Sequence, residues 1–343
     1  MSRRCLYIDH GPGETRAVVT LDGRPERLWL ERPDDLAVQQ HGARLVARVA
    51  GVDRSLASAF LDLGAGPQAV TPLVAGLVEG AAVEIEIAAE ARAGKGAVAR
   101  LLGPAEGPPR LLAPVAGLAQ RLQALAPGVT LVAGPLAREV ADAAQDAALA
   151  IDHPLAGGGS ICVEPTRALT AVDVDLGARA GDPRRIARAV NLLAVAEAAR
   201  VLRLKALGGL VVIDLIGRGH DGAALTAAAK AAFAPDNPGV SIGPVSRFGA
   251  FELVIPRRWR PVAERLCDAD GRLSADSRGF AVLRALERAA LADAGARLIA
   301  RAAPDAVEAA ARHISALTAR IGARAELRPD PALARDQFEI DVP

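Results

Sequence analysis

The fold is decided by residues 169–214, which read LTAVDVDLGARAGDPRRIARAVNLLAVAEAARVLRLKALGGLVVID. The stretch opens with alternating apolar and polar residues, the pattern of a strand with one buried face. Asp182-Pro183 then supplies a helix N-cap followed by a proline at the first helical position. We expect this helix to run to Leu207 and to end at Gly208-Gly209, before a nearly continuous apolar strand at 210–216. A strand, a long helix and a buried strand predict a βαβ unit with parallel strands.

Working outward from this unit, the sequence predicts further strands and helices on both sides. Short strands with Gly-centred turns between residues 43 and 103 are typical of a small barrel of the OB type. The other expected elements are N-terminal strands at 5–8, 15–20 and 27–30, helices at 111–125, 136–148 and 222–234, strands at 240–242 and 249–255, and, from 273, two helices flanking short strands that end with 338–342.

Composition excludes several classes of protein. Apolar residues make up 51% of the 343 residues, which indicates an ordered chain of two or three domains. The net charge of +1 means that any binding of nucleic acid must come from a local basic patch. Cys5, Cys162 and Cys267 are far apart, which argues against a disulfide framework or a Cys-rich zinc site. The sequence lacks a run of about 18 uncharged apolar residues, so we expect no membrane span and a cytoplasmic location.

Three carboxylates are candidates for a metal site. Residues two apart in a strand share a face, so Asp173 and Asp175 point the same way. Asp214 lies in the apolar strand, where an unpaired carboxylate would be costly. Carboxylates that converge near strand ends would bind a hard cation such as Mg²⁺. The alternative is that Asp214 merely ends its strand or caps a turn and that Asp173 and Asp175 face solvent.

Three segments in this part of the chain carry a resemblance to a known family. They are residues 158–175 (GGSICVEPTRALTAVDVD), 191–214 (NLLAVAEAARVLRLKALGGLVVID) and 246–252 (SRFGAFE). Together they resemble, in order and over about 100 residues, the catalytic part of the ribonuclease E/G family. The N-terminal half is similar more loosely, through residues 14–17 (ETRA), 48–64 (RVAGVDRSLASAFLDLG) and 94–97 (GKGA).

The resemblance implies an α+β multidomain fold. An OB-type S1 barrel would be inserted in a reduced ribonuclease H-like part, and a deoxyribonuclease I-like α/β catalytic domain would follow. The implied domains are a ribonuclease H-like part at 1–37, an S1-like barrel at 38–103, a linker and ribonuclease H-like remnant at 104–156, the catalytic domain at 157–262 and a small α/β domain at 263–343.

The resemblance also implies an activity, which is magnesium-dependent endonucleolytic cleavage of single-stranded RNA. The family's two metal-binding aspartates fall on Asp173 and Asp214, with Mg²⁺ as the cofactor and Mn²⁺ as a substitute. Asp175 lies two positions after the first of them and is a further catalytic candidate. Phe60 and Lys95 match S1 positions that contact RNA by base stacking and phosphate pairing. Arg247 and Phe248 match a family segment near the site and are also RNA-binding candidates.

Several positions depart from the family pattern. Asp175 replaces an asparagine and cannot donate the hydrogen bond that an amide gives, Gly217 replaces an acidic residue, and Val70 replaces an aromatic one. The family's zinc-link CxxC is reduced to Cys267, with Asp270 in the second place, so we expect no zinc. The sequence is compatible with a homodimer, whereas a zinc-linked tetramer is not expected. The alternatives to an enzyme are an RNA-binding protein that has lost catalysis and a scaffold that binds neither metal nor RNA.

Overall fold

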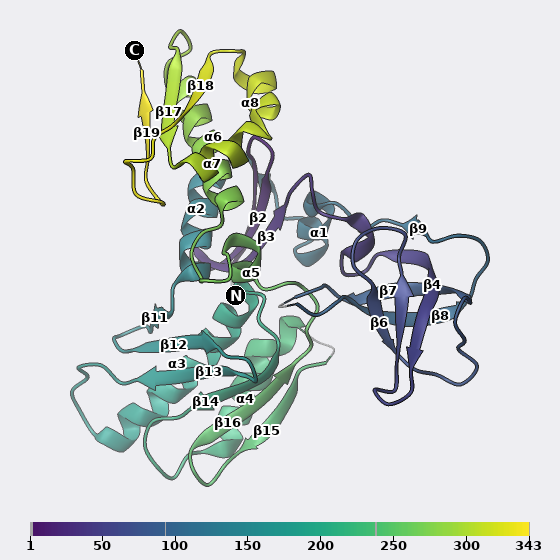
Figure 1. The fold of residues 1–343 in the computed structure, drawn as a ribbon. Helices are drawn as coiled ribbons and strands as arrows, with labels where there is room; N and C mark the ends of the chain where they lie inside the picture. Colours follow the sequence, from purple (N-terminus) through teal and green to yellow (C-terminus); the bar gives the residue numbers. More distant parts are fainter. Residues whose placement is uncertain (1–2, 93, 237–238, 343) are drawn as a thin grey trace.

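The structure is a computed structural model that describes residues 3–92, 94–236 and 239–342. It contains four sheets together with helices, so the predicted α+β class is confirmed. In Figure 1 a barrel of strands lies to one side, a six-stranded sheet at one end and the C-terminal three-stranded sheet at the other. Within the described ranges, no helix has the length and apolar character that crossing a membrane requires.

The N-terminal sheet has the order β10-β1-β2-β3 and is covered on both faces. Side chains on one face, such as Leu6 and Val19, pack on Leu122 of α1, and those on the other face, such as Val18 and Leu28, pack on α2. The elements are β1 (Arg4–His10), β2 (Thr15–Leu21), β3 (Arg24–Glu31), α1 (Leu118–Leu125), β10 (Leu131–Val132) and α2 (Pro135–Leu149).

The barrel follows the short helix η1 (Ala37–Gln39). Its strands are β4 (Arg44–Asp53), β5 (Ser58–Asp62), β6 (Ala69–Pro72), β7 (Ala82–Ala89), β8 (Val98–Pro104) and β9 (Arg110–Ala113). Their order is β5-β6-β8-β7-β4-β9, and β5 also pairs with β4, so five strands form a closed ring. Alternate residues, such as Val83, Ile85 and Ile87 of β7, fill its interior.

The six-stranded sheet has the order β11-β12-β13-β14-β16-β15. Its helices α3 and α4 pack on one face, where they bury residues such as Val172, Ile213 and Phe251. The opposite face carries the exposed residues of the same strands. The elements are β11 (Asp152–Pro154), β12 (Ser160–Pro165), β13 (Thr170–Asp175), α3 (Pro183–Leu204), β14 (Gly209–Asp214), α4 (Gly222–Phe233), η2 (Ala234–Asp236), β15 (Ser241–Val245) and β16 (Ala250–Ile255). β13 and β14 are parallel, as the βαβ pattern predicts.

The C-terminal part packs three helices on the sheet β18-β17-β19 around its own core. Its elements are α6 (Ala275–Ala292), β17 (Leu298–Ala302), α7 (Pro304–Ala311), α8 (Ile314–Ile321), β18 (Ala325–Pro329) and β19 (Phe338–Asp341), and α5 (Val262–Leu266) precedes them.

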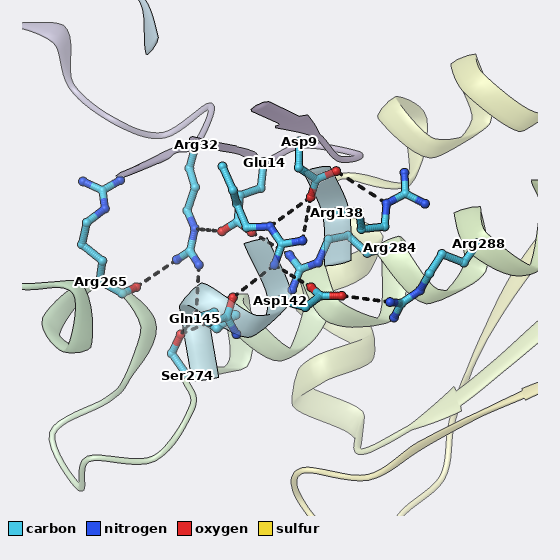
Figure 2. A network of polar contacts seen from close by, with 12 residues as sticks. Asp9, Glu14, Arg32, Arg138, Asp142, Gln145, Arg265, Ser274, Arg284 and Arg288 are labelled. Atoms are coloured by element: carbon cyan, nitrogen blue, oxygen red, sulfur yellow. Dashed lines mark hydrogen bonds and ion pairs between the residues drawn. The ribbon is translucent and has the colours of Figure 1, made fainter. Parts of the chain in front are cut away.

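A buried network of ion pairs joins the N-terminal sheet to α2 and α6, as Figure 2 shows. At its centre Arg16, which is fully buried, donates to Asp9 from Nε (3.0 Å) and Nη2 (2.6 Å) and to Asp142 from Nη1 (2.7 Å). Arg284 of α6 donates to Glu14 (2.6 Å). Burial alone would lower the pKa of Arg16, but the charges of Asp9 and Asp142 outweigh it and raise that pKa. The network therefore holds Arg16 charged and fixes α6 to α2 and to the turn between β1 and β2.

Four local predictions are wrong. α3 ends at Leu204 and not at Leu207, because Ala206 adopts the left-handed conformation (φ 55°) and Leu207 N–H donates to Leu202 O (2.9 Å), which closes the helix. Residues 111–125 are not one helix, since β9 pairs with β4 before α1 begins. The barrel sheet thus extends beyond residue 103. The C-terminal part contains three helices instead of two within the described ranges.

Candidate functional site

Asp173 and Asp214 lie side by side on the uncovered face of the six-stranded sheet. β13 and β14 are parallel, and the two aspartates are direct partners in the register. Neighbouring strands are about 4.8 Å apart, so the two backbones bring the carboxylates close together. Because Val172 and Ile213 point into the core, the alternation of each strand sends the aspartates outward. Both carboxylates are exposed, so the expectation that Asp214 sits in a costly buried position is wrong.

Neither aspartate has a partner that neutralises it. Within the described ranges, the carboxylates of Asp173 and Asp214 form no hydrogen bond and no ion pair. Asp175 differs, because its Oδ1 accepts from Gly177 N–H (3.0 Å) in the turn after β13. The described residues contain no group of three His, Cys, Asp or Glu side chains able to hold a metal ion. A cation at the aspartate pair would therefore have two protein carboxylates and take its other ligands from water or substrate.

The neighbouring strands β11 and β12 also place acidic residues near the aspartate pair. Cys162 lies opposite Asp173 in the register and opposite Asp152 on its other side. Burial raises the pKa of the Cys162 thiol, and the charges of Glu164, Asp152 and Asp173 raise it further. The thiol is therefore protonated at neutral pH, and this part of the face favours a cation.

The segment after Asp214 is held in place by Asn191, to which the sequence analysis assigned no role. Asn191 lies buried in α3, and its side chain accepts from Ile216 N–H and donates to Ile216 O, both at 3.0 Å. An asparagine between apolar residues in the first half of this helix was the available signal. At Gly217, next along the chain, φ is +87°. This backbone conformation favours glycine.

Arg247 and Phe248 lie in the turn between β15 and β16, at the same end of the sheet as Asp214. Ala250 is the register partner of Asp214, and Leu215 N–H donates to Gly249 O (3.2 Å), so the turn is tied to the segment after β14. Phe248 is 81% exposed, and the Arg247 guanidinium lies 4.6 Å from its ring centroid. An exposed ring under a cation is a platform on which a nucleic-acid base can stack.

His220 lies beside the same turn. A cavity of about 660 Å³ is lined by His220, Lys230, Ser246 and Arg247, together with Gly219, Gly222, Ala223, Thr226, Ala227, Pro244 and Val245. The His220 Nε2 atom is buried and has no hydrogen-bond partner within the described part of the chain. Asp221 instead caps α4 by accepting from Ala224 N–H (3.0 Å) and pairs with Arg188 (2.6 Å).

The two barrel candidates lie on its outer surface. Phe60 is half-buried and is the register partner of Val70, which in turn pairs with Val98 of β8. These three side chains form an apolar row outside the barrel core. Lys95 is exposed in the hairpin between β7 and β8, where it bridges to Arg92.

Comparison with known proteins finds similarity in the segment that carries the aspartate pair. The model of the Ribonuclease E/G family matches residues 136–258. Ribonuclease E of Haemophilus influenzae is 36% identical over 148 residues, covering 40% of this chain and 16% of that protein. Ribonuclease E of Escherichia coli is 34% identical, covering 40% and 14%. Ribonuclease G of Salmonella typhimurium is 26% identical over 202 residues, covering 54% and 41%. The matched segments thus span less than half the length of these relatives.

Proposed function

Because this chain belongs to the ribonuclease E/G family, we propose that it is an endoribonuclease that cleaves single-stranded RNA with Mg²⁺, or Mn²⁺ as a substitute. The observation that carries the proposal is the pairing of Asp173 and Asp214 in the register of two parallel strands, with both carboxylates exposed. Two unpartnered carboxylates side by side repel each other, and a divalent cation between them relieves that repulsion.

Asp173 and Asp214 would hold the cation. Their oxygens are the hard ligands that Mg²⁺ prefers, and an open site with two carboxylates leaves positions for water and a phosphate oxygen. When bound, Mg²⁺ supplies a Lewis acid for the scissile phosphate and a water of lowered pKa for in-line attack. Asp175, the next residue on the same face, adds negative charge beside the pair. Asn191 positions the segment that follows Asp214 through its two hydrogen bonds to Ile216.

The remaining candidates would hold the RNA. Phe248 would stack on a base next to the cleaved bond, and Arg247 would pair with a phosphate. On the barrel, Phe60 would stack on a base and Lys95 would contact the backbone. The closed ring of β4 to β8 supports an S1-like barrel of the OB type at this position.

The domain organisation that we propose keeps the boundaries predicted from the sequence except that the barrel continues through β9 (Arg110–Ala113), with a reduced ribonuclease H-like part around the barrel and a deoxyribonuclease I-like catalytic domain. We propose that no zinc is bound at Cys267. Burial raises the pKa of its thiol, and the charge of Asp268 raises it further, whereas zinc takes the thiolate. A homodimer remains compatible with this proposal, and we expect the protein to act in the cytoplasm.

Cleavage of a fluorescently labelled single-stranded RNA tests the function. With Mg²⁺ or Mn²⁺ we expect cutting by the wild type and a loss of more than about 100-fold in Asp173→Asn and Asp214→Asn. Loss of a hydrogen-bond partner of a metal ligand already costs roughly 10- to 100-fold, and loss of the ligand itself should cost more. Glu308→Gln is the matched control, because this exposed residue of α7 also loses one negative charge.

The second candidate function, an RNA-binding protein without catalysis, is favoured by Val70, Asp175 and Gly217, which replace an aromatic, an amide and an acidic residue of the family pattern. It predicts RNA binding without cutting in either metal. If the wild type neither binds nor cuts the RNA, both functions are excluded.

A further inference from the structure

A second charged cavity lies at the opposite end of β13 and β14 from the aspartate pair. Its volume is about 560 Å³. Four segments form it: the turn between β12 and β13, the turn between α3 and β14, the stretch from β16 into α5, and the hairpin between β7 and β8 of the barrel. The cavity therefore joins the barrel to the six-stranded sheet.

Four cations line this cavity, namely Arg92, Lys95, Arg167 and Arg257. Within the described ranges, none of them forms an ion pair with a carboxylate. Burial and the charge of Arg257 lower the pKa of Arg92, and the charge of Glu264 opposes them in part. Glu264, the acidic residue of the described lining, lies 4.0 Å from Arg260.

This charge excess contrasts with the rest of the chain. Arginines in other contacts between parts are matched by carboxylates, as Arg27 is by Asp236 (2.9 Å) and Arg203 is by Glu26 (3.1 Å). A group of unmatched cations around one concave surface is stabilised when an anion binds there.

The cations are held in place by the backbone. Arg92 and Lys95 form an antiparallel bridge in which Arg92 N–H donates to Lys95 O (3.0 Å) and Lys95 N–H donates to Arg92 O (2.7 Å). Arg257 donates from Nε to Gly208 O (3.1 Å). A Cβ atom on residue 209 would overlap the Arg257 guanidinium, and Gly209 also has a φ of +99°. The two glycines after α3 thus leave the space that the Arg257 side chain occupies beside the cavity.

We propose that this cavity binds phosphate groups of the RNA backbone, away from the cleaved bond. The choice of ligand rests on the proposed function, because a single-stranded RNA is the polyanion that would reach both sites. Thr170 lines the cavity and Asp173 lies three residues further along β13, a distance of about 10 Å at about 3.3 Å per residue. An RNA strand whose phosphates are bound in the cavity reaches the aspartate pair within about three stacked nucleotides, at roughly 3.4 Å each. The cavity would align the RNA along the sheet.

Binding of a labelled single-stranded RNA of about 12 nucleotides, a length within the range of OB-type sites, tests the proposal. Fluorescence anisotropy is measured without divalent cations, so that no cleavage occurs, over a series of salt concentrations. The test variant is Arg92→Gln/Arg167→Gln/Arg257→Gln. The matched control is Arg297→Gln/Arg312→Gln/Arg328→Gln, which removes three exposed arginines of the C-terminal part.

We expect the affinity of the test variant for RNA to fall and the slope of log K against log salt to become shallower by about 2. Each phosphate contact with a single strand contributes about 0.7 to that slope. The control should match the wild type. An unchanged slope and affinity in the test variant would overturn the proposal.

A second arm distinguishes a small phosphate ligand from the RNA backbone. Inorganic phosphate and uridine monophosphate are titrated as competitors of the labelled RNA. If either binds the wild type tightly while the RNA affinity is the same in wild type and test variant, the cavity serves a small ligand and the backbone proposal fails.

The outcome is separable from the proposed function. Weaker RNA binding by the test variant together with a wild type that never cuts RNA would uphold the cavity and exclude the nuclease. Wild-type cleavage together with unchanged RNA binding in the test variant would uphold the nuclease and exclude the phosphate-binding cavity.

Discussion

Asp9→Asn should destabilise the protein far more than an exposed substitution of the same kind. The Asp9 carboxylate is 3% exposed and accepts from Arg16 Nε (3.0 Å), from Arg16 Nη2 (2.6 Å) and from Arg138 Nε (3.5 Å). The amide keeps the shape but removes the charge, which leaves Arg16 buried with Asp142 as its remaining carboxylate partner. Removing one partner of a buried ion pair costs about 3–5 kcal/mol.

Urea unfolding followed by circular dichroism measures this cost. Total stabilities of about 5–15 kcal/mol are usual, so the expected loss is a large fraction and the midpoint should fall clearly. Asp276→Asn is the control, because its ion pair with Arg312 is more than half exposed and is worth about 0–1 kcal/mol. The reasoning is refuted if the two substitutions lower the midpoint equally. The double variant with Arg16→Gln should cost less than the sum of the two single variants, since the two residues are directly coupled.

Three further predictions follow from other buried contacts. Burial and the neighbouring cations Lys205 and Arg200 lower the pKa of His153 to about 4, so the unfolded chain, with a His pKa near 6.5, binds the proton first. Stability should be full above about pH 6.5 and fall by up to about 3 kcal/mol towards pH 4, and urea midpoints of His153→Gln should lack this part of the fall. Gly209→Ala should displace the Arg257 guanidinium and strain a left-handed backbone, so fluorescence anisotropy should report weaker RNA binding. Unchanged RNA binding would contradict the role of Gly209 in placing Arg257 beside the cavity. Asn191→Leu should leave two backbone groups without partners, cost about 1–3 kcal/mol in urea unfolding, and slow RNA cleavage, and a variant with wild-type stability and rate would contradict its positioning role.

The parts of the fold that were predicted correctly are those in which local pattern and burial agree. Three local patterns each have one interpretation: the alternation in residues 170–175, the Asp182 cap and the apolar run before Asp214. Together they placed α3 between two parallel strands. Asp182 does accept from Arg185 N–H (2.8 Å), as the cap requires.

The errors arose where tertiary contacts decide between local alternatives. Residues 110–113 can be read as the start of a helix, but their pairing with β4 makes them a strand. Glycines at 208 and 209 suggested the end of α3, yet a left-handed Ala206 ends it earlier and the glycines accommodate Arg257 instead. Both outcomes depend on residues far away in the sequence.

The candidate site was predictable in its residue types but not in its environment. Spacing placed Asp173 and Asp175 on one face and the apolar strand singled out Asp214, and the family resemblance then assigned Asp173 and Asp214 as the metal ligands. Because the face without helices cannot be read from the sequence of one strand, Asp214 was wrongly expected to be buried. The charged cavity as a whole was not predictable either, although Lys95 was a candidate, since its four cations come from three separate segments.

The most direct test of the account is the dependence of the single-turnover rate of RNA cleavage on Mg²⁺ concentration, for the wild type and Asp214→Asn. If the aspartate pair holds the cation, the wild-type rate should saturate, and the variant should require far more Mg²⁺ to reach half of its own maximal rate while its RNA affinity without metal stays unchanged. An identical Mg²⁺ dependence in the two proteins would contradict the assignment of Asp173 and Asp214 as the metal centre.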